Sequence, residues 1–318
     1  MSKSTTGSRQ ARPTTKNPST KRPARTGSPN AATFRSRHRR LSALVPVALV
    51  VAAIATMVVI KAAAGPSSAT ASHLAAGSAA SAPASTGTSA LPQSIVASLS
   101  VSPTTLDSVG SPGSVVPPSS VGGSGAILRA AGGKPEVTYV GAEYCPYCAA
   151  ERWALAVALS RFGTFANLSG THSSSADVYP NTQTLSFYGS SYSSTYLDFQ
   201  AVEEATNQVV GDTYQSLQAP TAAESSLLAK YDAQGSIPFL DIGNKYVITG
   251  ASYSPQVLQG LSRAQIAAQL GNAASPVAQA IDGTANNITA AICRVTGNQP
   301  SAVCTSPAIA AIAKNLGS

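Results

Sequence analysis

The chain has 318 residues and a formal net charge of +8, although only 11% of its residues are charged and 6% are aromatic. Its four cysteines and two methionines exclude a densely disulfide-linked miniprotein and a Met-rich binding groove. Residues 1–40 hold 11 Lys/Arg and no acid, which leaves 10 basic against 13 acidic residues in the remainder. We therefore expect the globular part to have no nucleic-acid partner.

Residues 1–40 combine Ser, Thr, Pro and Gly with Lys/Arg and contain almost no large apolar side chain. Such a composition predicts a disordered, basic, cytoplasmic tail. Residues 41–60 then run for 20 positions without a charge, enough for a helix of about 30 Å, the thickness of a hydrocarbon core. We predict a transmembrane helix over 41–61. A buried helix of a soluble domain is the alternative, but such helices rarely lack a polar face.

The flanking charges predict the orientation of this helix. The basic tail precedes it and only Lys61 follows closely, so the positive-inside rule places the N-terminus in the cytoplasm. A cleaved signal is the alternative, because residues 62–64 are all Ala and Arg39-Arg40 weakly resembles a twin-arginine signal. Both interpretations place the second half outside the cytoplasm. We expect a single-pass protein of the cell membrane.

Residues 62–125 consist mainly of Ala, Ser, Pro, Gly, Thr and Val, with no aromatic residue and a single acid, Asp107. This pattern predicts a low-complexity tether. Of the 18 aromatic residues, 17 lie between Tyr139 and Tyr253. Because a stable core needs large side chains, we expect the globular domain over 126–318.

The most informative pattern is a strand, a CxxC motif and a helix in succession. Residues 136–142 are typical of a buried strand, CPYC runs from Cys145 to Cys148, and apolar positions at helical spacing follow over 149–162. A helix N-terminus stabilises a thiolate, and Pro fits the first helical turn. The pattern predicts thiol–disulfide exchange, with Cys145 as the attacking sulfur and Cys148 as the resolving sulfur.

Half of a zinc site is the other interpretation of CxxC. The remaining cysteines, Cys293 and Cys304, are separated by ten residues, and His172 has no partner at metal-ligand spacing. We therefore expect no metal and no dissociable cofactor. For Cys293 and Cys304 we predict a structural disulfide across a helix break, with a second redox pair as the alternative.

The segment YVGAEYCPYCAAERW resembles the active site of the thioredoxin superfamily, and CPYC is the variant typical of glutaredoxins. The stretch 136–165, with SIPFLDIGNKYVITG further on, is similar to thioredoxin-like proteins described as domain of unknown function 929. The resemblance covers residues 126–318, about 60% of the chain. It implies an α/β, thioredoxin-like fold: a central mixed sheet flanked by helices, with an insertion and a C-terminal helical extension.

The resemblance also implies a cis-proline opposite the dithiol, at the start of a strand. Pro238 fits this position, although a Pro there also suits an ordinary edge strand. It would bring the Ile237 backbone beside the dithiol, where an extended substrate can pair with it. Tyr144 and Tyr147 flank the cysteines and are candidate substrate-binding residues. Glu143 is either a solvated loop acid or a modulator of the thiol pKa.

Within the insertion we predict a second parallel strand, then a strand or helix start, then a helix, over 183–188, 198–204 and 222–231. The Ser/Tyr-rich stretch 189–196 is expected as a loop over or beside the site. On the helix after CPYC, we expect Glu151 and Arg152 on a solvated face and Trp153 in the core.

Together these patterns predict a membrane-anchored, extracytoplasmic protein thiol–disulfide oxidoreductase. Its partners would be exported thiol or disulfide proteins, and the resemblance implies a membrane redox partner, such as a quinone-linked oxidase of the disulfide-forming type. The alternative is a non-catalytic thioredoxin-fold binding module tethered at the cell envelope, in which CPYC has only a structural role.

Overall fold

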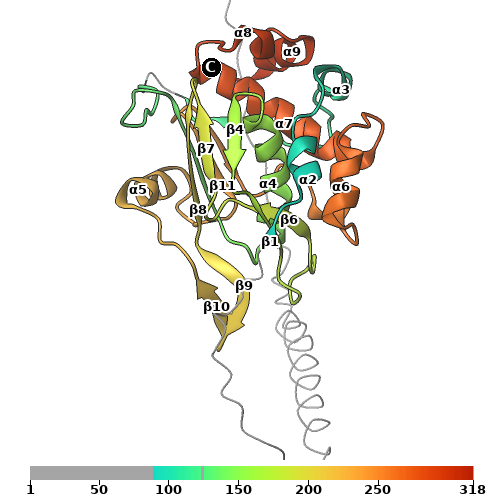
Figure 1. Cartoon of the computed structure of the whole chain (residues 1–318). Helices are drawn as coiled ribbons and strands as arrows, with labels where there is room; N and C mark the ends of the chain where they lie inside the picture. Colours follow the sequence, from blue (N-terminus) through green and yellow to red (C-terminus); the bar gives the residue numbers. More distant parts are fainter. Residues whose placement is uncertain (1–88, 123–124, 318) are drawn as a thin grey trace, which may run out of the picture. The chain divides into compact units, whose positions relative to one another are not determined.

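A computed structural model describes residues 89–122 and 125–317 of the chain (Figure 1). These residues form a mixed α/β structure around a five-stranded sheet with the strand order β2-β12-β11-β3-β8. In that order the strands are Ser119–Ser120, Tyr246–Thr249, Phe239–Ile242, Glu136–Gly141 and Asp198–Glu203. β3 and β8 run parallel and the other neighbouring pairs are antiparallel, so the predicted mixed sheet is confirmed.

The central strand β3 is apolar on both faces, and each face packs into a separate core. Val137 and Tyr139 belong to the larger core, whereas Val140 joins a smaller cluster with Val202 and Phe239. This division follows from the alternation of side chains along a strand. Both faces of the sheet are therefore covered.

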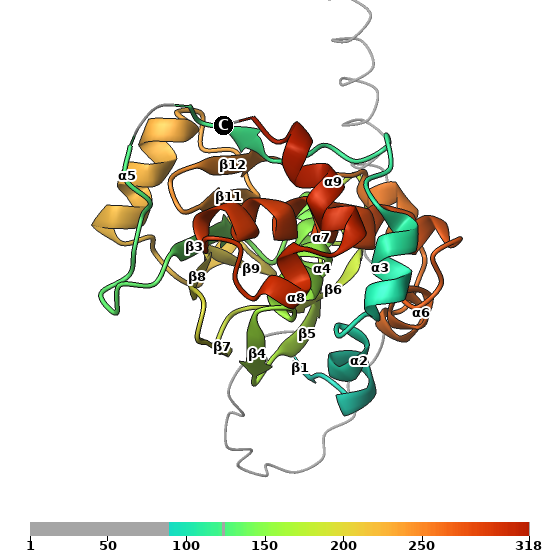
Figure 2. The same cartoon turned by 90° about the horizontal axis from the view of Figure 1, so that it is seen from above.

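Helices of the larger core cover one face of the sheet, and a single helix lies on the other (Figure 2). The larger core contains α4 (Pro146–Leu159) and α7 (Pro276–Val295). α4 and α7 pack closely against each other, because the five alanines of α4 are small enough to let the two helices approach. The predicted helix α5 (Ala222–Tyr231) is confirmed, and its apolar residues pack on the smaller cluster.

The predicted domain start at residue 126 is too late, and the described part of the predicted tether is folded. Three elements lie before that boundary: β1 (Ser89–Ala90), α2 (Gln93–Ser98) and α3 (Pro103–Val109). The side chains of Ile95, Leu99 and Leu106 are buried in the larger core.

The partner that holds this segment in place lies far along the chain. Asn286 of α7 donates hydrogen bonds to the carbonyls of Leu106 and Gly110, both at 2.8 Å. Sparse Leu and Ile in a Ser- and Pro-rich sequence give little local indication of such packing. The composition of the segment alone therefore suggested a tether.

The insertion contributes strands to three small antiparallel sheets. β1 pairs with β5, which pairs with β6; β4 pairs with β7; and β9 pairs with β10. Their bounds are Ser169–His172 for β5, Gln183–Ser186 for β6, Gly163–Ala166 for β4, Ser191–Ser194 for β7, Ala205–Val210 for β9 and Thr213–Ser216 for β10. The predicted second parallel strand over 183–188 is wrong: β6 is antiparallel to β5, and β8 is the parallel partner of β3.

The remaining helices surround α7. They are the 3-10 helix η1 (Pro255–Leu258), α6 (Arg263–Gln269), α8 (Ser301–Cys304) and α9 (Pro307–Asn315). α6 contacts α2, while α9 contacts α3 and α7. Helices from the two ends of the described chain thus pack against each other in the larger core.

The predicted basic tail, the predicted transmembrane helix over 41–61 and residues 62–88 of the predicted tether lie outside the described residues. Within 89–122 and 125–317, no helix has both the length and the apolar character needed to cross a membrane.

Candidate active site

Cys145 is the N-cap residue of α4, directly before Pro146 in the first turn. Its Sγ accepts a hydrogen bond from the backbone N–H of Cys148 at 3.3 Å. Both thiols are free; Cys145 is 5% exposed and Cys148 is fully buried. The sulfur therefore occupies the position in which an N-cap side chain satisfies the unpaired N–H groups of a helix.

The two thiols have opposite pKa shifts. The pKa of Cys145 lies below its ordinary value, first because the Cys148 thiol donates to it and also because backbone N–H groups and Arg152 favour its thiolate, against the effect of burial. Burial raises the pKa of Cys148 well above its ordinary value. The outer sulfur is therefore the better nucleophile of the pair.

The strand register brings Pro238 to the dithiol. Phe239 of β11 pairs with Val140 of β3, so the residues before Phe239 lie opposite the loop that leads to Cys145. The Ile237–Pro238 peptide bond is cis, and Cys145 Sγ lies 3.9 Å from the carbonyl oxygen of Ile237. The predicted site residues Ile237 and Pro238 are thus next to the outer sulfur.

Aromatic side chains from the insertion extend the surface around CPYC. Tyr144 stacks on Tyr214 of β10 with ring centroids 4.1 Å apart, and Tyr147 meets the ring of Tyr179 edge to face. Tyr147 is exposed, and Tyr144 is half-buried. Tyr179 and Tyr214 were not predicted as site residues, because neither lies near CPYC in the sequence.

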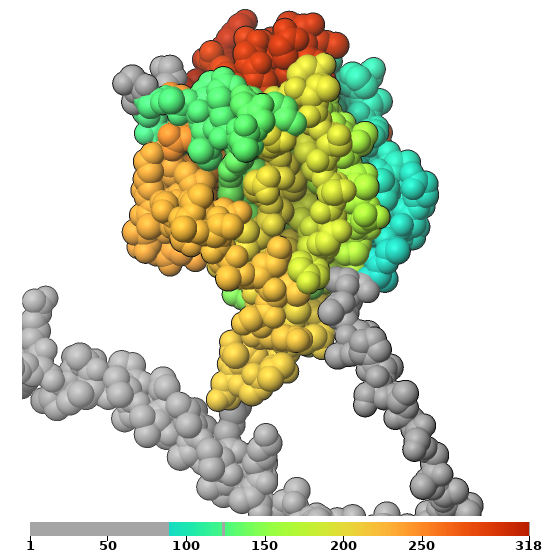
Figure 3. Space-filling view, turned by 60° about the vertical axis from the view of Figure 1, so that its left-hand side comes forward, coloured from blue at the N-terminus to red at the C-terminus, as the bar shows by residue number. Residues whose placement is uncertain are grey.

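The β9–β10 hairpin follows β8 and projects from the molecule beside this surface (Figure 3). Its Val209 and Val210 are each 60% exposed. The backbone of the hairpin is anchored at the site, because Glu143 N–H donates to the carbonyl of Ala205 at 2.9 Å. The prediction of a loop beside the site over 189–196 is wrong: the stretch contains β7, and its Tyr192 hydroxyl donates to the carbonyl of Leu159, at the other end of α4.

Glu143 is buried, so its interpretation as a solvated loop acid is wrong. Thr171 Oγ1 donates to its Oε2 at 3.4 Å. Burial raises the pKa of Glu143, and the nearby Ser186 hydroxyl and Arg152 guanidinium oppose that shift. Its role as a modulator of the thiols stays a prediction.

A second correction concerns Arg152, which was expected on a solvated face and is fully buried. Its Nε and Nη2 donate to the two carboxylate oxygens of Glu203 at 2.8 and 2.6 Å, a bidentate ion pair. Nη2 also donates to the carbonyl of Ala142 at 2.7 Å, and the same carbonyl accepts from the backbone N–H of Cys145. Arg152 therefore fixes the loop that carries the outer cysteine.

Glu151 was also expected in solvent and is fully buried. The backbone N–H and hydroxyl of Ser252 donate to its two oxygens at 2.8 and 3.2 Å. Burial raises its pKa to about 7. Trp153 is in the core, as predicted, and its Nε1 donates to the carbonyl of Gln183.

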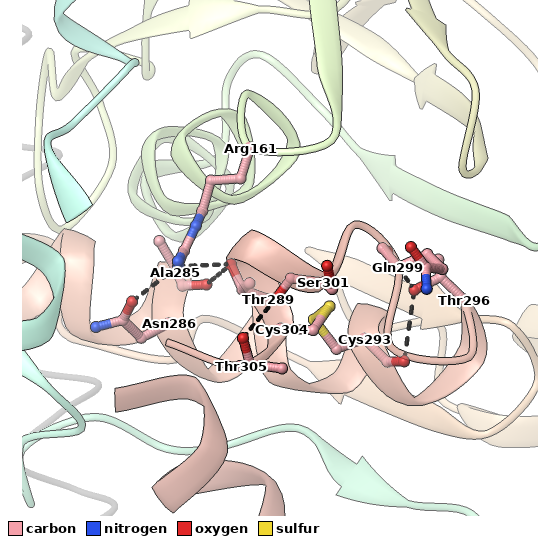
Figure 4. Close-up of a disulfide and its surroundings, with 10 residues drawn as sticks. All are labelled: Arg161, Ala285, Asn286, Thr289, Cys293, Thr296, Gln299, Ser301, Cys304 and Thr305. Atoms are coloured by element: carbon pink, nitrogen blue, oxygen red, sulfur yellow. Dashed lines mark hydrogen bonds between the residues drawn. A yellow bond between two sulfur atoms is a disulfide. The ribbon is translucent and has the colours of Figure 1, made fainter. Parts of the chain in front are cut away.

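Cys293 and Cys304 form the predicted disulfide, with Cα atoms 5.6 Å apart (Figure 4). The bond joins the last turn of α7 to α8. Arg161, just beyond the C-terminal end of α4, donates to Thr289 of α7, one turn before Cys293. The disulfide is therefore at the end of α4 opposite to the free dithiol.

A metal site would need further ligands near CPYC. In the part of the chain that the structure describes, no group of three or more His, Cys, Asp or Glu side chains is arranged to hold a metal ion.

The fold and the site define an α/β protein with a free dithiol at the N-terminus of a buried helix. The family model described as "Domain of unknown function (DUF929)" matches residues 129–294, and the chain belongs to that family. Comparison with curated proteins and with solved structures found no match.

Proposed function

We propose that this chain is a protein thiol–disulfide oxidoreductase with a thioredoxin-like fold. The observation that carries the proposal is the placement of Cys145: its sulfur caps α4, lies beside the Ile237 carbonyl and has a lowered pKa. The sequence of strand, CPYC and helix, with a cis-proline opposite, supports the fold assignment.

The exchange proceeds in two steps. A substrate thiolate attacks Cys145 Sγ of the oxidised pair; a substrate–Cys145 disulfide forms and the Cys145–Cys148 bond breaks, leaving the electron pair on Cys148 Sγ. A second substrate thiolate then attacks the substrate sulfur of the mixed disulfide; a substrate disulfide forms, the bond to Cys145 breaks with the electron pair on Cys145 Sγ, and the chain is left as the dithiol. In the reverse direction Cys145 attacks a substrate disulfide, and Cys148 resolves the mixed disulfide.

The substrate we propose is an exported thiol or disulfide protein. The apolar span over 41–60 and the basic residues before it support an extracytoplasmic location. The Cys293–Cys304 disulfide is consistent with an oxidising compartment. A membrane redox partner would then restore the dithiol or disulfide state after each turnover.

Reduction of insulin with added dithiothreitol tests the proposal. The purified full-length chain should accelerate insulin precipitation, and Cys145→Ala should abolish the acceleration, because the outer sulfur forms the mixed disulfide. A wild-type rate no higher than that of Cys145→Ala would instead favour the non-catalytic binding module.

A further inference from the structure

Two buried donors next to the dithiol have no hydrogen-bond partner among the described residues. They are the hydroxyl of Tyr139 on β3 and the Nη1 of Arg152 on α4. Both side chains are fully buried, so bulk solvent does not reach them. An unpaired buried donor costs about 1–3 kcal/mol, and native proteins leave few of them. Two such donors together indicate a partner that is not present in the neutral dithiol.

The sulfur of Cys148 adjoins both groups. A β-carbon at Gly141 would lie 2.2 Å from Tyr139 Oη and 3.1 Å from Cys148 Sγ, so hydroxyl and sulfur border the same space, which is open only because residue 141 is Gly. Arg152 lies one turn after Cys148 on the same face of α4. Its guanidinium carbon is 6.0 Å from the centroid of the Tyr139 ring.

We propose that Tyr139 and Arg152 form a thiolate-binding site that stabilises Cys148 while it carries the negative charge during exchange. This inference rests on the proposed function. When a substrate thiolate attacks Cys145 of the disulfide, the electron pair leaves on Cys148 Sγ, in a place without solvent. Charge that develops in such a site needs fixed donors or an opposite charge, because water cannot supply either.

The surroundings of Arg152 support this role. Glu203 holds the guanidinium through Nε and Nη2, which leaves Nη1 as the free donor. Burial raises the pKa of the Cys148 thiol, and the positive charge of Arg152 is the main electrostatic influence that lowers it. The hydroxyl of Tyr139 rotates about its C–O bond and so can direct its hydrogen to an anionic sulfur.

Tyr139→Phe tests the inference without a large change in packing. The oxidised full-length chain is mixed with reduced glutathione, and the reaction is quenched with acid and followed by mass spectrometry. We expect reduction to slow roughly ten-fold, equivalent to about 1.4 kcal/mol, because the leaving thiolate loses a charge-assisted hydrogen bond. A purely structural hydroxyl predicts an unchanged rate, since it has no partner to lose.

Tyr246→Phe is the matched control. Tyr246 is a buried residue of the same sheet, and its hydroxyl donates to Gly317 rather than facing the dithiol. We expect a wild-type rate with a lower unfolding midpoint. A Tyr139→Phe rate equal to that of wild type would overturn the inference and leave the proposed function standing. Failure of glutathione to reduce wild type would overturn both.

The contribution of Arg152 needs a paired variant, because removing one member of a buried ion pair leaves an uncompensated charge. Arg152→Met combined with Glu203→Met removes both charges and replaces them with apolar side chains of similar length. We expect this folded variant to be reduced at least ten-fold more slowly than wild type. A wild-type rate would contradict the role given to Arg152.

Discussion

Asp282 of α7 is buried, and neither of its carboxylate oxygens has a hydrogen-bond partner among the described residues. Burial raises its pKa to about 8, whereas the ordinary value is 3.8. The folded chain therefore holds a proton on Asp282 that the unfolded chain releases above pH 4. The free energy of unfolding should fall as pH rises from about 4 to about 8, because the native state binds more protons over that window.

Asp282→Asn should remove this pH dependence. One proton retained on folding corresponds to about 1.4 kcal/mol per pH unit. The free energy of unfolding of the variant, relative to that of wild type, should therefore rise steadily between pH 5 and pH 8. Urea unfolding at several pH values measures the difference, and Asp212→Asn, at an exposed turn, serves as the control. Parallel curves for wild type and Asp282→Asn would contradict the buried, protonated carboxyl. Glu151, with a pKa of about 7, contributes in the same direction in both proteins and cancels in the comparison.

Residues of the site differ in how far the sequence predicts them. The two sulfurs follow from a local pattern, CPYC before a helix, whereas the role of Pro238 was expected from the resemblance to the thioredoxin superfamily. Arg152 follows from neither, because its partner Glu203 is 51 residues away and a charged side chain on a helix is usually exposed. Burial of such a pair depends on packing that no local pattern encodes.

At the scale of elements, the β9–β10 hairpin is one of the parts of the insertion that reach the residues around the dithiol, through Tyr214 on Tyr144. Its Val209 lies directly opposite Tyr214, and both Val209 and Val210 expose apolar side chains at the surface of the hairpin. If the chain acts on unfolded exported proteins, this surface lies where an extended segment would continue past the mixed disulfide. The hairpin should then affect binding of proteins more than chemistry at sulfur.

Val209→Ser combined with Val210→Ser tests this role. Removing two exposed apolar side chains should leave stability within about 0.5 kcal/mol. It should raise KM for reduced, unfolded protein roughly five-fold, because the substrate then has less apolar surface to bind, while the rate with glutathione stays the same. Val116→Ser, a substitution at a residue 63% exposed between α3 and β2, is the control. An equal effect on protein substrate and glutathione would exclude a docking role for the hairpin.

Among the elements, those with strong local patterns were predicted well: β3, α4 and α5. The parallel partner of β3 was not, because 183–188 and 198–204 have similar strand propensity and only tertiary pairing selects the second. The helices α2 and α3 were missed for a related reason. Their few apolar residues are buried by α6, α7 and α9, which lie more than 150 residues further along the chain.

At the scale of the whole molecule, the two cysteine pairs lie at opposite ends of α4 and should act independently. Replacing Cys293 and Cys304 with Ala opens a loop with a sequence separation of 11, worth about 3 kcal/mol or less by the chain-entropy estimate. We expect a lower unfolding midpoint and unchanged exchange, measured by urea unfolding and the insulin assay. A variant of unchanged stability that has lost turnover would make the distal pair part of the electron path.

The central claim is that Cys145 forms the mixed disulfide with substrate and Cys148 resolves it. Trapping tests it most directly: Cys148→Ser and Cys145→Ser chains are each incubated with an oxidised, unfolded protein, and the linked peptides are mapped by mass spectrometry. We predict stable mixed disulfides through Cys145 in Cys148→Ser and almost none in Cys145→Ser, because the remaining Cys148 is fully buried and its pKa is raised. Equal trapping by both variants, or by neither, would contradict the account.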